Sequence, residues 1–339
     1  MSEFIHDIDL EELATKKDMP YSASIEILTK CNFKCEHCYI PHHTEEMKYD
    51  VIINIVNQLK ELGVVELMIT GGEIALHKHF MDIVRYVRKL GIRLILFSNI
   101  SLLNEDQIKV LSELYITEIS TSLFSLNDKI NSSITGVENS GEKVIENALL
   151  IRKYNIPLEI KVPIMKKNRK SYKEIEKFCD NNGIKITYTT AITSKTDGNC
   201  APCEFALCQK ELNEFILKND PSSMEVTQNY SEICNDYVCK AVGSNLHIDV
   251  KGHVYPCISF PYVYGSILED SLEEIWYKSN ARKVLKNIRK GELTGCVQCD
   301  LNNVCLRCPG LAYSEQKSLL GCSILDKKLA ISRKTGNSF

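Results

Sequence analysis

The first half of the chain alternates two kinds of hydrophobic pattern. Short runs rich in β-branched and apolar residues predict strands, and the segments between them carry apolar residues every three or four positions, as in helices with one buried face. In the first helical segment these residues recur from Val51 to Leu62, and Gly63 then ends the helix. Strands are predicted at 22–28, 65–70, 93–98, 118–124, 158–164 and 185–192, and further helices at 80–90, 104–114, 142–154 and 169–182.

Six strands that alternate with helices indicate parallel βαβ units and an α/β fold. Eight units would close a full barrel, so six units predict an open, partial (βα)6 barrel of the TIM type. A doubly wound open sheet is the structural alternative. In both folds, ligand sites form at the carboxyl ends of the strands.

The pattern changes near residue 193, where the alternation ends and cysteines become dense. One amphipathic stretch, residues 272–293, holds the single tryptophan, Trp276. We expect an N-terminal extension at 1–20, the barrel at 21–192, a connecting segment at 193–233 and a small cysteine-rich domain at 234–339.

Composition narrows the class of protein. The 339 residues carry a net charge of -3, which gives no basis for nucleic-acid binding. The N-terminus lacks an apolar signal region, and no apolar run approaches the roughly 20 residues that span a bilayer, so we expect a cytoplasmic protein that does not enter a membrane. In that compartment, 15 cysteines indicate metal ligation or catalysis rather than a disulfide framework.

Cys31, Cys35 and Cys38 follow the first predicted strand in the pattern C-x3-C-x2-C, and Tyr39 comes next. Three thiolates can hold three corners of a [4Fe–4S] cube, which leaves one iron open for a ligand. The alternatives are three scattered buried cysteines or part of a zinc site. The motif resembles the signature of the radical SAM enzymes, whose core is also a partial barrel. The resemblance implies that the open iron binds S-adenosylmethionine (SAM), which is cleaved to a 5′-deoxyadenosyl radical that abstracts a substrate hydrogen.

The same resemblance implies further contacts to SAM. Gly71, Gly72 and Glu73 match the family's GGE motif, which holds the methionine amino group, although Ile74 stands where proline is usual. A simple turn is the alternative. The other implied SAM-binding residues are Tyr39, Ser98, Asn99 and Ser122, with Lys161 as a substitute for a missing carboxylate contact; ordinary polar caps on strand ends are the alternative for Ser98, Asn99 and Ser122.

The C-terminal cysteines resemble the SPASM extension of radical SAM enzymes, with two residues where the family usually has three between the last central pair. The resemblance implies two auxiliary [4Fe–4S] clusters, the first held by Cys234, Cys239, Cys257 and Cys308 and the second by Cys296, Cys299, Cys305 and Cys322. Zinc is the alternative. Cys234 lies outside the core motif, and without it the first cluster would have an open iron.

Four cysteines remain outside these sets. Cys179 lies on the apolar face of a predicted helix and is expected to be a buried small hydrophobe. Cys200, Cys203 and Cys208 cluster in the connecting segment, where they could be redox-active, bind substrate sulfur or be incidental.

The resemblance is to the maturases of ribosomally made peptides, which install oxidative thioether or carbon–carbon crosslinks. Sulfatase maturases place an acid where Ile258 stands, which counts against that activity. The alternatives are a SPASM-type dehydrogenase that acts on a small molecule or a sulfatase-type protein substrate, and a non-enzymatic electron carrier or sensor. We expect a short precursor peptide as substrate and a flavodoxin- or ferredoxin-type reductant. Only about 20 residues precede the first strand, too few for a leader-binding domain, so a separate leader-binding protein or a barrel surface is expected.

Overall fold

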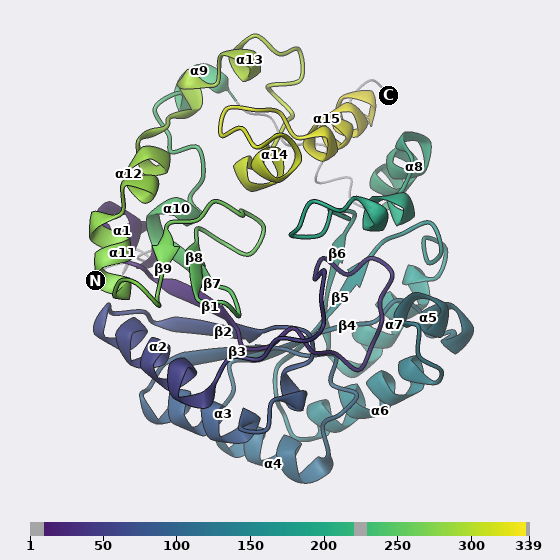
Figure 1. The fold of residues 1–339 in the computed structure, drawn as a ribbon. Helices are drawn as coiled ribbons and strands as arrows, with labels where there is room; N and C mark the ends of the chain where they lie inside the picture. The colour runs from purple at the N-terminus through teal and green to yellow at the C-terminus, as the bar shows by residue number, and fades with distance from the viewer. Residues whose placement is uncertain (1–9, 220–228, 337–339) are drawn as a thin grey trace, which may run out of the picture.

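The computed structural model describes residues 10–219 and 229–336. Residues 1–9 of the expected extension and 220–228 of the expected connecting segment lie outside the described residues. Within the described chain, one nine-stranded sheet has the order β6-β5-β4-β3-β2-β1-β7-β8-β9, and it curves around the centre of the molecule (Figure 1).

The six predicted strands are all present, and each is parallel to its neighbours, which confirms the partial barrel. Five of the predicted strands run too far at their carboxyl ends by one to three residues. Apolar residues such as Ile27, Leu28 and Leu123 follow the ladder and are fully buried, because they pack over the end of the barrel. The observed strands are β1 (Ser22–Glu26), β2 (Glu66–Thr70), β3 (Arg93–Phe97), β4 (Glu118–Ser122), β5 (Leu158–Pro163) and β6 (Lys185–Thr189).

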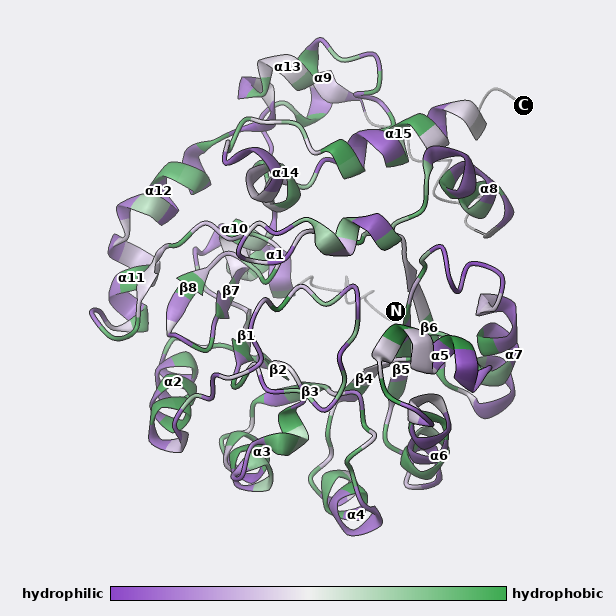
Figure 2. Cartoon of the chain, turned by 45° about the vertical axis from the view of Figure 1, so that its right-hand side comes forward, coloured by the Kyte–Doolittle hydropathy of each residue, from purple (hydrophilic) through white to green (hydrophobic). Residues whose placement is uncertain are grey.

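Helices cover the outer face of this sheet (Figure 1). Ile25 and Ile160 alternate with polar residues along their strands, and both belong with Leu67 to the same buried core as the apolar stripes of these helices. Hydrophobic and hydrophilic residues alternate around the helices (Figure 2). The covering helices are α2 (Tyr49–Glu61), α3 (Phe80–Lys89), α4 (Glu105–Glu113), α6 (Ser140–Lys153) and α7 (Tyr172–Asn182), and the pattern did not predict the additional α5 (Asp128–Thr135).

The inner face of the barrel carries several polar side chains. Glu159 is buried there and accepts hydrogen bonds from the Ser120 Oγ at 2.9 Å and the Thr187 Oγ1 at 2.6 Å. Glu26 is also buried, at the carboxyl end of β1. Because strand residues alternate between faces, each apolar outer position is paired with an inner position that is free to line a site.

The C-terminal part continues the same sheet. β7 (Asn245–Ile248) pairs in parallel with β1, and β8 (His253–Tyr255) and β9 (Gly265–Ser266) follow as antiparallel strands. The sequence pattern predicted none of these three strands. The expected barrel and the cysteine-rich domain therefore share one sheet.

Short helices complete the C-terminal part. The amphipathic stretch at 272–293 is divided at Ser279, whose hydroxyl caps the following helix and donates to the Tyr264 carbonyl at 2.6 Å. No described helix has the length and apolar character that crossing a membrane requires. The remaining helices are α1 (Leu10–Lys16), η1 (Ile74–Leu76), η2 (Ala201–Phe205), α8 (Gln209–Asn219), α9 (Tyr230–Ile233), α10 (Ala241–Ser244), α11 (Leu272–Lys278), α12 (Asn280–Asn287), η4 (Lys290–Glu292), α13 (Thr294–Val297), α14 (Pro309–Gln316) and α15 (Ile324–Gly336).

Candidate functional site

The first group of thiols lies in the loop that follows β1, at the carboxyl edge of the barrel. A turn joins the Cys38 N–H to the Cys35 carbonyl at 3.1 Å. Burial, and then the charges of Glu73 and Cys38, raise the pKa of Cys31 to about 11. Burial also raises the pKa of Cys35, which interacts electrostatically with the other two thiols. The structure therefore brings the three predicted thiols together.

Helix α5 holds this cysteine loop in place. The Lys34 N–H donates to the Thr135 carbonyl at 2.7 Å, and the Glu36 N–H donates to the Ile134 carbonyl at 3.1 Å. The Glu36 carboxylate pairs with Lys167 Nζ at 2.6 Å. The backbone of the loop is thus fixed between its cysteines, which preorganises the three thiols.

Gly71 and Gly72 allow the turn after β2 to pass directly against the segment before Cys31. A Cβ on Gly72 would lie 2.2 Å from the Lys30 carbonyl oxygen and 2.4 Å from that of Thr29. The Gly72 N–H donates to the Leu28 carbonyl at 2.9 Å. These glycines therefore allow the cysteine loop to pack against the turn, whether or not the turn also binds a ligand.

The carboxylate of Glu73 connects the turn after β2 to the loop after β3. It is fully buried and accepts hydrogen bonds from the Ser98 hydroxyl at 2.7 Å, the Asn99 N–H at 2.6 Å and the Ala75 N–H at 3.0 Å. Burial raises the pKa of Glu73, and these donors oppose that shift. In this structure Glu73 positions Ser98 and Asn99.

Asn99 links the loop after β3 to the first thiol group. Its Nδ2 donates to Asn32 Oδ1 at 2.8 Å and lies 3.9 Å from the Cys31 Sγ. The next residue, Ile100, has a left-handed φ of 56°, which is strained for a β-branched side chain. Asn147 on α6 holds that strained residue, because its amide donates to the Ile100 carbonyl at 2.6 Å.

Of the other predicted SAM-binding residues, Tyr39 lies in the cysteine loop, and Ser122 and Lys161 lie on β4 and β5. The Tyr39 hydroxyl is directed at Glu26 on β1, at an oxygen–oxygen distance of 3.5 Å. Ser122 and Lys161 are opposite each other in the β4–β5 ladder. The Lys161 Nζ pairs with Glu159 at 3.4 Å and sits over an aromatic ring of β3. Tyr39 thus contacts β1, whereas Ser122 and Lys161 lie on β4 and β5, with β2 and β3 between them and β1 in the sheet.

A cavity of about 390 Å³ adjoins the cysteine loop. The loop contributes Tyr39, β1 contributes Glu26, and the hairpin and turn of the C-terminal part contribute Asp249, Tyr255 and Cys257. Burial, and then the Asp249 charge, raise the pKa of Glu26 to about 7. This cavity places a proton-exchanging carboxyl group between the first thiol group and the C-terminal thiols.

The C-terminal thiols form two groups. Burial, and then the thiols of Cys239 and Cys308, raise the pKa of Cys257 to about 12. Burial, and then Asp326 and three other thiols, raise the pKa of Cys305 to about 11. These thiols form a second group, separate from that of Cys257. Besides Cys305, this second group comprises Cys296, Cys299 and Cys322.

Cys234, the fourth predicted ligand of the first auxiliary cluster, lies beside η4. Its thiol donates to the Ser231 carbonyl at 3.3 Å, and its own carbonyl accepts the Gly291 N–H at 2.8 Å. Its role as a ligand stays a prediction.

Two family matches identify the chain. Residues 25–181 match the Radical SAM superfamily, and residues 239–309 match the SPASM iron–sulfur cluster-binding domain. The chain is a radical SAM enzyme with a SPASM domain. The matched segments contain the first thiol group and six of the seven thiols of the C-terminal groups, with Cys322 beyond them.

Relatives of this radical SAM enzyme have varied names. A tungsten-containing aldehyde ferredoxin oxidoreductase cofactor-modifying protein of Pyrococcus furiosus is 24% identical over 83% of this chain and 87% of its own length. An AdoMet-dependent heme synthase of Methanosarcina barkeri is 21% identical over 85% of this chain and 91% of its own. The sporulation killing factor maturation protein SkfB of Bacillus subtilis is 23% identical over 76% of this chain and 65% of its own.

Solved structures share the fold. Streptococcus suis SuiB, crystallised with its precursor peptide SuiA, superposes with a TM-score of 0.72 over 94% of this chain and 79% of that chain, at 19% identity. The likeness covers both the barrel and the C-terminal part of this radical SAM enzyme.

The cofactors of this radical SAM enzyme are SAM, the [4Fe–4S] cluster that binds it, and auxiliary [4Fe–4S] clusters in the SPASM domain. The donor sets fit them, because three thiols leave one iron of a cube open and four thiols fill a cube. Within residues 10–219 and 229–336, no three His, Cys, Asp or Glu side chains are placed to hold one metal ion. Thiols that each bind a different iron of a cube lie farther apart than ligands of a single ion.

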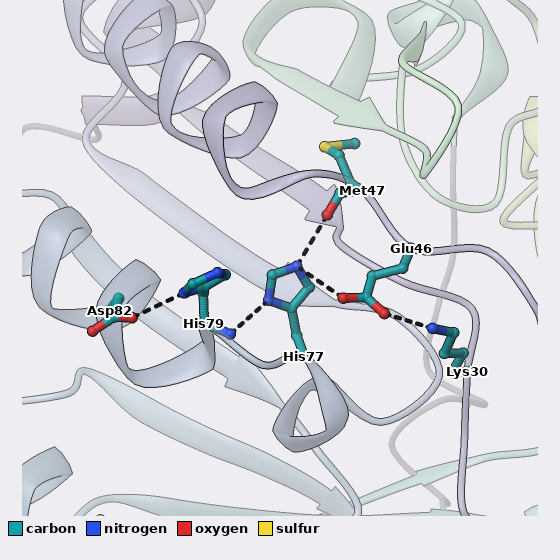
Figure 3. Close-up of polar contacts among 6 residues, drawn as sticks. All are labelled: Lys30, Glu46, Met47, His77, His79 and Asp82. Carbon is teal, nitrogen blue, oxygen red and sulfur yellow. Dashed lines mark hydrogen bonds and ion pairs between the residues drawn. The ribbon is translucent and has the colours of Figure 1, made fainter.

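A histidine network supports the SAM side of the enzyme (Figure 3). The buried His77 Nε2 donates to the Met47 carbonyl at 3.0 Å and lies 3.7 Å from the Glu46 carboxylate, while its Nδ1 accepts the His79 N–H at 3.2 Å. These partners fix one tautomer. Glu46 also pairs with Lys30, the residue before Cys31, at 2.6 Å. The network ties the turn after β2 to both ends of the cysteine loop.

The remaining cysteines occupy two environments. Cys179 is fully buried on α7, as expected for a small hydrophobe. Cys200, Cys203 and Cys208 are exposed, and burial and the neighbouring Cys200 raise the pKa of Cys203.

The sequence reasoning missed several cavity residues. Glu26 carried a visible signal, since it is the only charged residue of the predicted strand 22–28. Asp249 and Tyr255 carried none, because their place beside the barrel depends on the pairing of β7 with β1.

Proposed function

We propose that this radical SAM enzyme is a maturase that removes a hydrogen atom from a ribosomally made peptide and installs a thioether or carbon–carbon crosslink. Cys31, Cys35 and Cys38 would hold the SAM-binding cluster. In the SPASM domain, Cys239, Cys257 and Cys308, with Cys234 as the fourth candidate, would hold the first auxiliary cluster. The second would be held by Cys296, Cys299, Cys305 and Cys322.

The observation that carries the proposal is the position of the 390 Å³ cavity. It is lined by Tyr39 on one side and Cys257 on the other, so a side chain placed in it would lie between the SAM site and the first auxiliary site. The names of SkfB, a maturation protein, and of SuiB with its precursor peptide support a peptide as the occupant.

When bound, SAM and its cluster supply the radical that takes the hydrogen atom. Closing a crosslink then releases one further proton and one electron from the peptide. Glu26 is the buried carboxyl group that faces the cavity, and Asp249 beside it keeps Glu26 ready to exchange a proton near neutral pH. Cys257 lines the same cavity, which gives the electron a short path to the first auxiliary site.

The test is anaerobic co-expression with the short peptide encoded beside the gene, followed by intact mass measurement. We expect the peptide to lose two hydrogens, and we expect Cys35→Ala to abolish the loss. Cys179→Ala is the matched control, because this buried cysteine lies outside the three thiol groups and its variant should still modify the peptide.

A small-molecule substrate is the second candidate. The cofactor-modifying protein and the heme synthase both match a larger share of this chain than SkfB does. A peptide of unchanged mass, with SAM still cleaved by the reconstituted enzyme, would favour this candidate.

The same peptide assay tests the two expected protein partners. Omitting other proteins from the assay would show whether a separate leader-binding protein is needed. Exchanging a flavodoxin for a ferredoxin would identify the reductant.

A further inference from the structure

Arg307 lies between the two thiol groups of the SPASM domain. In the sequence Cys305-Leu306-Arg307-Cys308, the first cysteine belongs to one group and the last to the other. The chain therefore passes directly from one auxiliary site to the other at this point, with a single arginine on the way.

The guanidinium of Arg307 is held by two carbonyls of one loop. Its Nε donates to the Gly321 carbonyl at 2.9 Å, and its Nη2 donates to the Leu319 carbonyl at 2.8 Å. Its third nitrogen, Nη1, is buried and has no hydrogen-bond partner among the described residues. A buried donor without an acceptor is costly, and a guanidinium cannot remove that cost by losing its proton. The geometry therefore calls for an acceptor beside Nη1.

The space beside Arg307 is a cavity of about 830 Å³ that Cys239, Cys305 and Cys308 also line. Thiols of both groups thus open on the cavity that Arg307 lines. The acceptor class that these residues imply is sulfur, either a ligand thiolate or a cluster sulfide.

The charge of Arg307 lies beside both groups. Arg307 comes two residues after Cys305 and directly before Cys308, and it lines the cavity that Cys239 also lines. The opposing charge is Asp326, whose carboxylate accepts the Cys308 N–H at 2.7 Å. A cation beside both groups favours added negative charge on whatever their thiols hold.

We propose that Arg307 is a positioning residue for both auxiliary clusters: its Nη1 donates to a cluster sulfur, and its charge raises the reduction potentials of the two clusters. The inference rests on the auxiliary clusters of the SPASM domain and not on the peptide substrate. Because hydrogen bonds to sulfur and local charge set iron–sulfur potentials, Arg307 makes these clusters better electron acceptors.

The test uses the full chain carrying Cys35→Ala, so that the auxiliary clusters are observed without the SAM-binding cluster. Arg307→Gln and Arg307→Lys are reconstituted anaerobically, and iron content and EPR-monitored midpoint potentials are measured. We expect Arg307→Gln to lower the potentials, and we expect Arg307→Lys, which keeps the charge, to lower them less.

The matched control is Arg289→Gln, which removes the same charge from a side chain that sits over the Tyr237 ring, 4.2 Å from its centroid. It should leave the potentials unchanged. Full iron content and wild-type potentials in both Arg307 variants would overturn the proposal. If Arg307→Gln does not fold, Arg307→Lys decides alone: a lowered potential supports the hydrogen bond to sulfur, and an unchanged potential overturns it. None of these readouts depends on a substrate, so a failed peptide assay leaves them interpretable.

Discussion

At the residue scale, Gly72 shows how a family motif can have a packing reason of its own. A methyl group at this position would overlap the Lys30 and Thr29 carbonyl oxygens, and neither backbone can move without shifting the residues before Cys31. We expect Gly72→Ala to destabilise the protein by at least about 3 kcal/mol, the upper end for overpacking, and to lower its iron content. Iron per chain and thermal unfolding under anaerobic conditions would measure both effects. Gly295→Ala, where a methyl group meets open space, should change neither.

Glu26 predicts a specific pH dependence of stability. Burial, then Asp249, raise its folded-state pKa from an ordinary 4.5 to about 7. The folded protein therefore binds this proton more tightly than the unfolded chain does. The resulting stability is fully present below pH 4.5 and is lost as the pH rises through about 7.

Glu26→Gln should abolish this dependence. Between about pH 5 and pH 8, the variant should gain on the order of 3 kcal/mol relative to wild type, as a shift of this size implies. Denaturant unfolding at the two pH values would measure the gain. Glu61→Gln, on the exposed side of α2, should show the same pH dependence of stability as wild type. An equal gain in stability in that variant would contradict the assignment to Glu26.

At the element scale, the strands and helices of the barrel were predictable because each has its own local hydrophobic period. The strand ends were not, since Ile27 and Leu123 are apolar for a reason beyond the ladder, namely packing over the barrel end. Helix α5 was missed because its eight residues, DKINSSIT, carry only two large apolar side chains. The spacing of the cysteines predicted which thiols of the first group and of the Cys257 and Cys305 groups approach one another, whereas the role of Cys234 stays a prediction.

The strained loop after β3 depends on one side chain of α6. Asn147 is buried and donates to the Ile100 carbonyl at 2.6 Å and the Leu103 carbonyl at 2.9 Å. Asn147→Leu would remove the amide donor from both carbonyls and leave the Ile100 carbonyl with the Leu103 N–H at 3.2 Å, which should cost about 2 kcal/mol. It should also weaken SAM binding, because Asn99 is part of the released loop. Calorimetric SAM titration and thermal melting would measure these effects, with Asn54→Leu on the exposed face of α2 as the control.

At the scale of the whole molecule, the joining of the two parts could not be predicted. β7 has only four residues, and its partner β1 lies more than 200 positions earlier, so no local pattern marks the pair. A second link is equally non-local: the Trp276 indole N–H donates to the Asp18 carbonyl at 2.8 Å, and Arg282 pairs with the Asp18 carboxylate at 2.6 Å. These contacts make the barrel and the SPASM part a single structural unit.

A single unit should unfold in a single transition. Trp276 is the only tryptophan and is buried in the SPASM part, whereas the barrel dominates the far-ultraviolet circular dichroism. We expect denaturation curves followed by tryptophan fluorescence and by circular dichroism to coincide. Two separated midpoints would show that the β1–β7 ladder does not couple the two parts.

The β1–β7 ladder also bears on how such enzymes can diversify. Recombination that brought in a foreign cluster domain would have to supply a strand matching the β1 edge from Ser22 to Ile25, or leave that edge open to aggregation. Lineages built on this plan should therefore inherit barrel and cluster domain together. New specificity would then come from changes around the cavity that both halves line, and not from the exchange of modules.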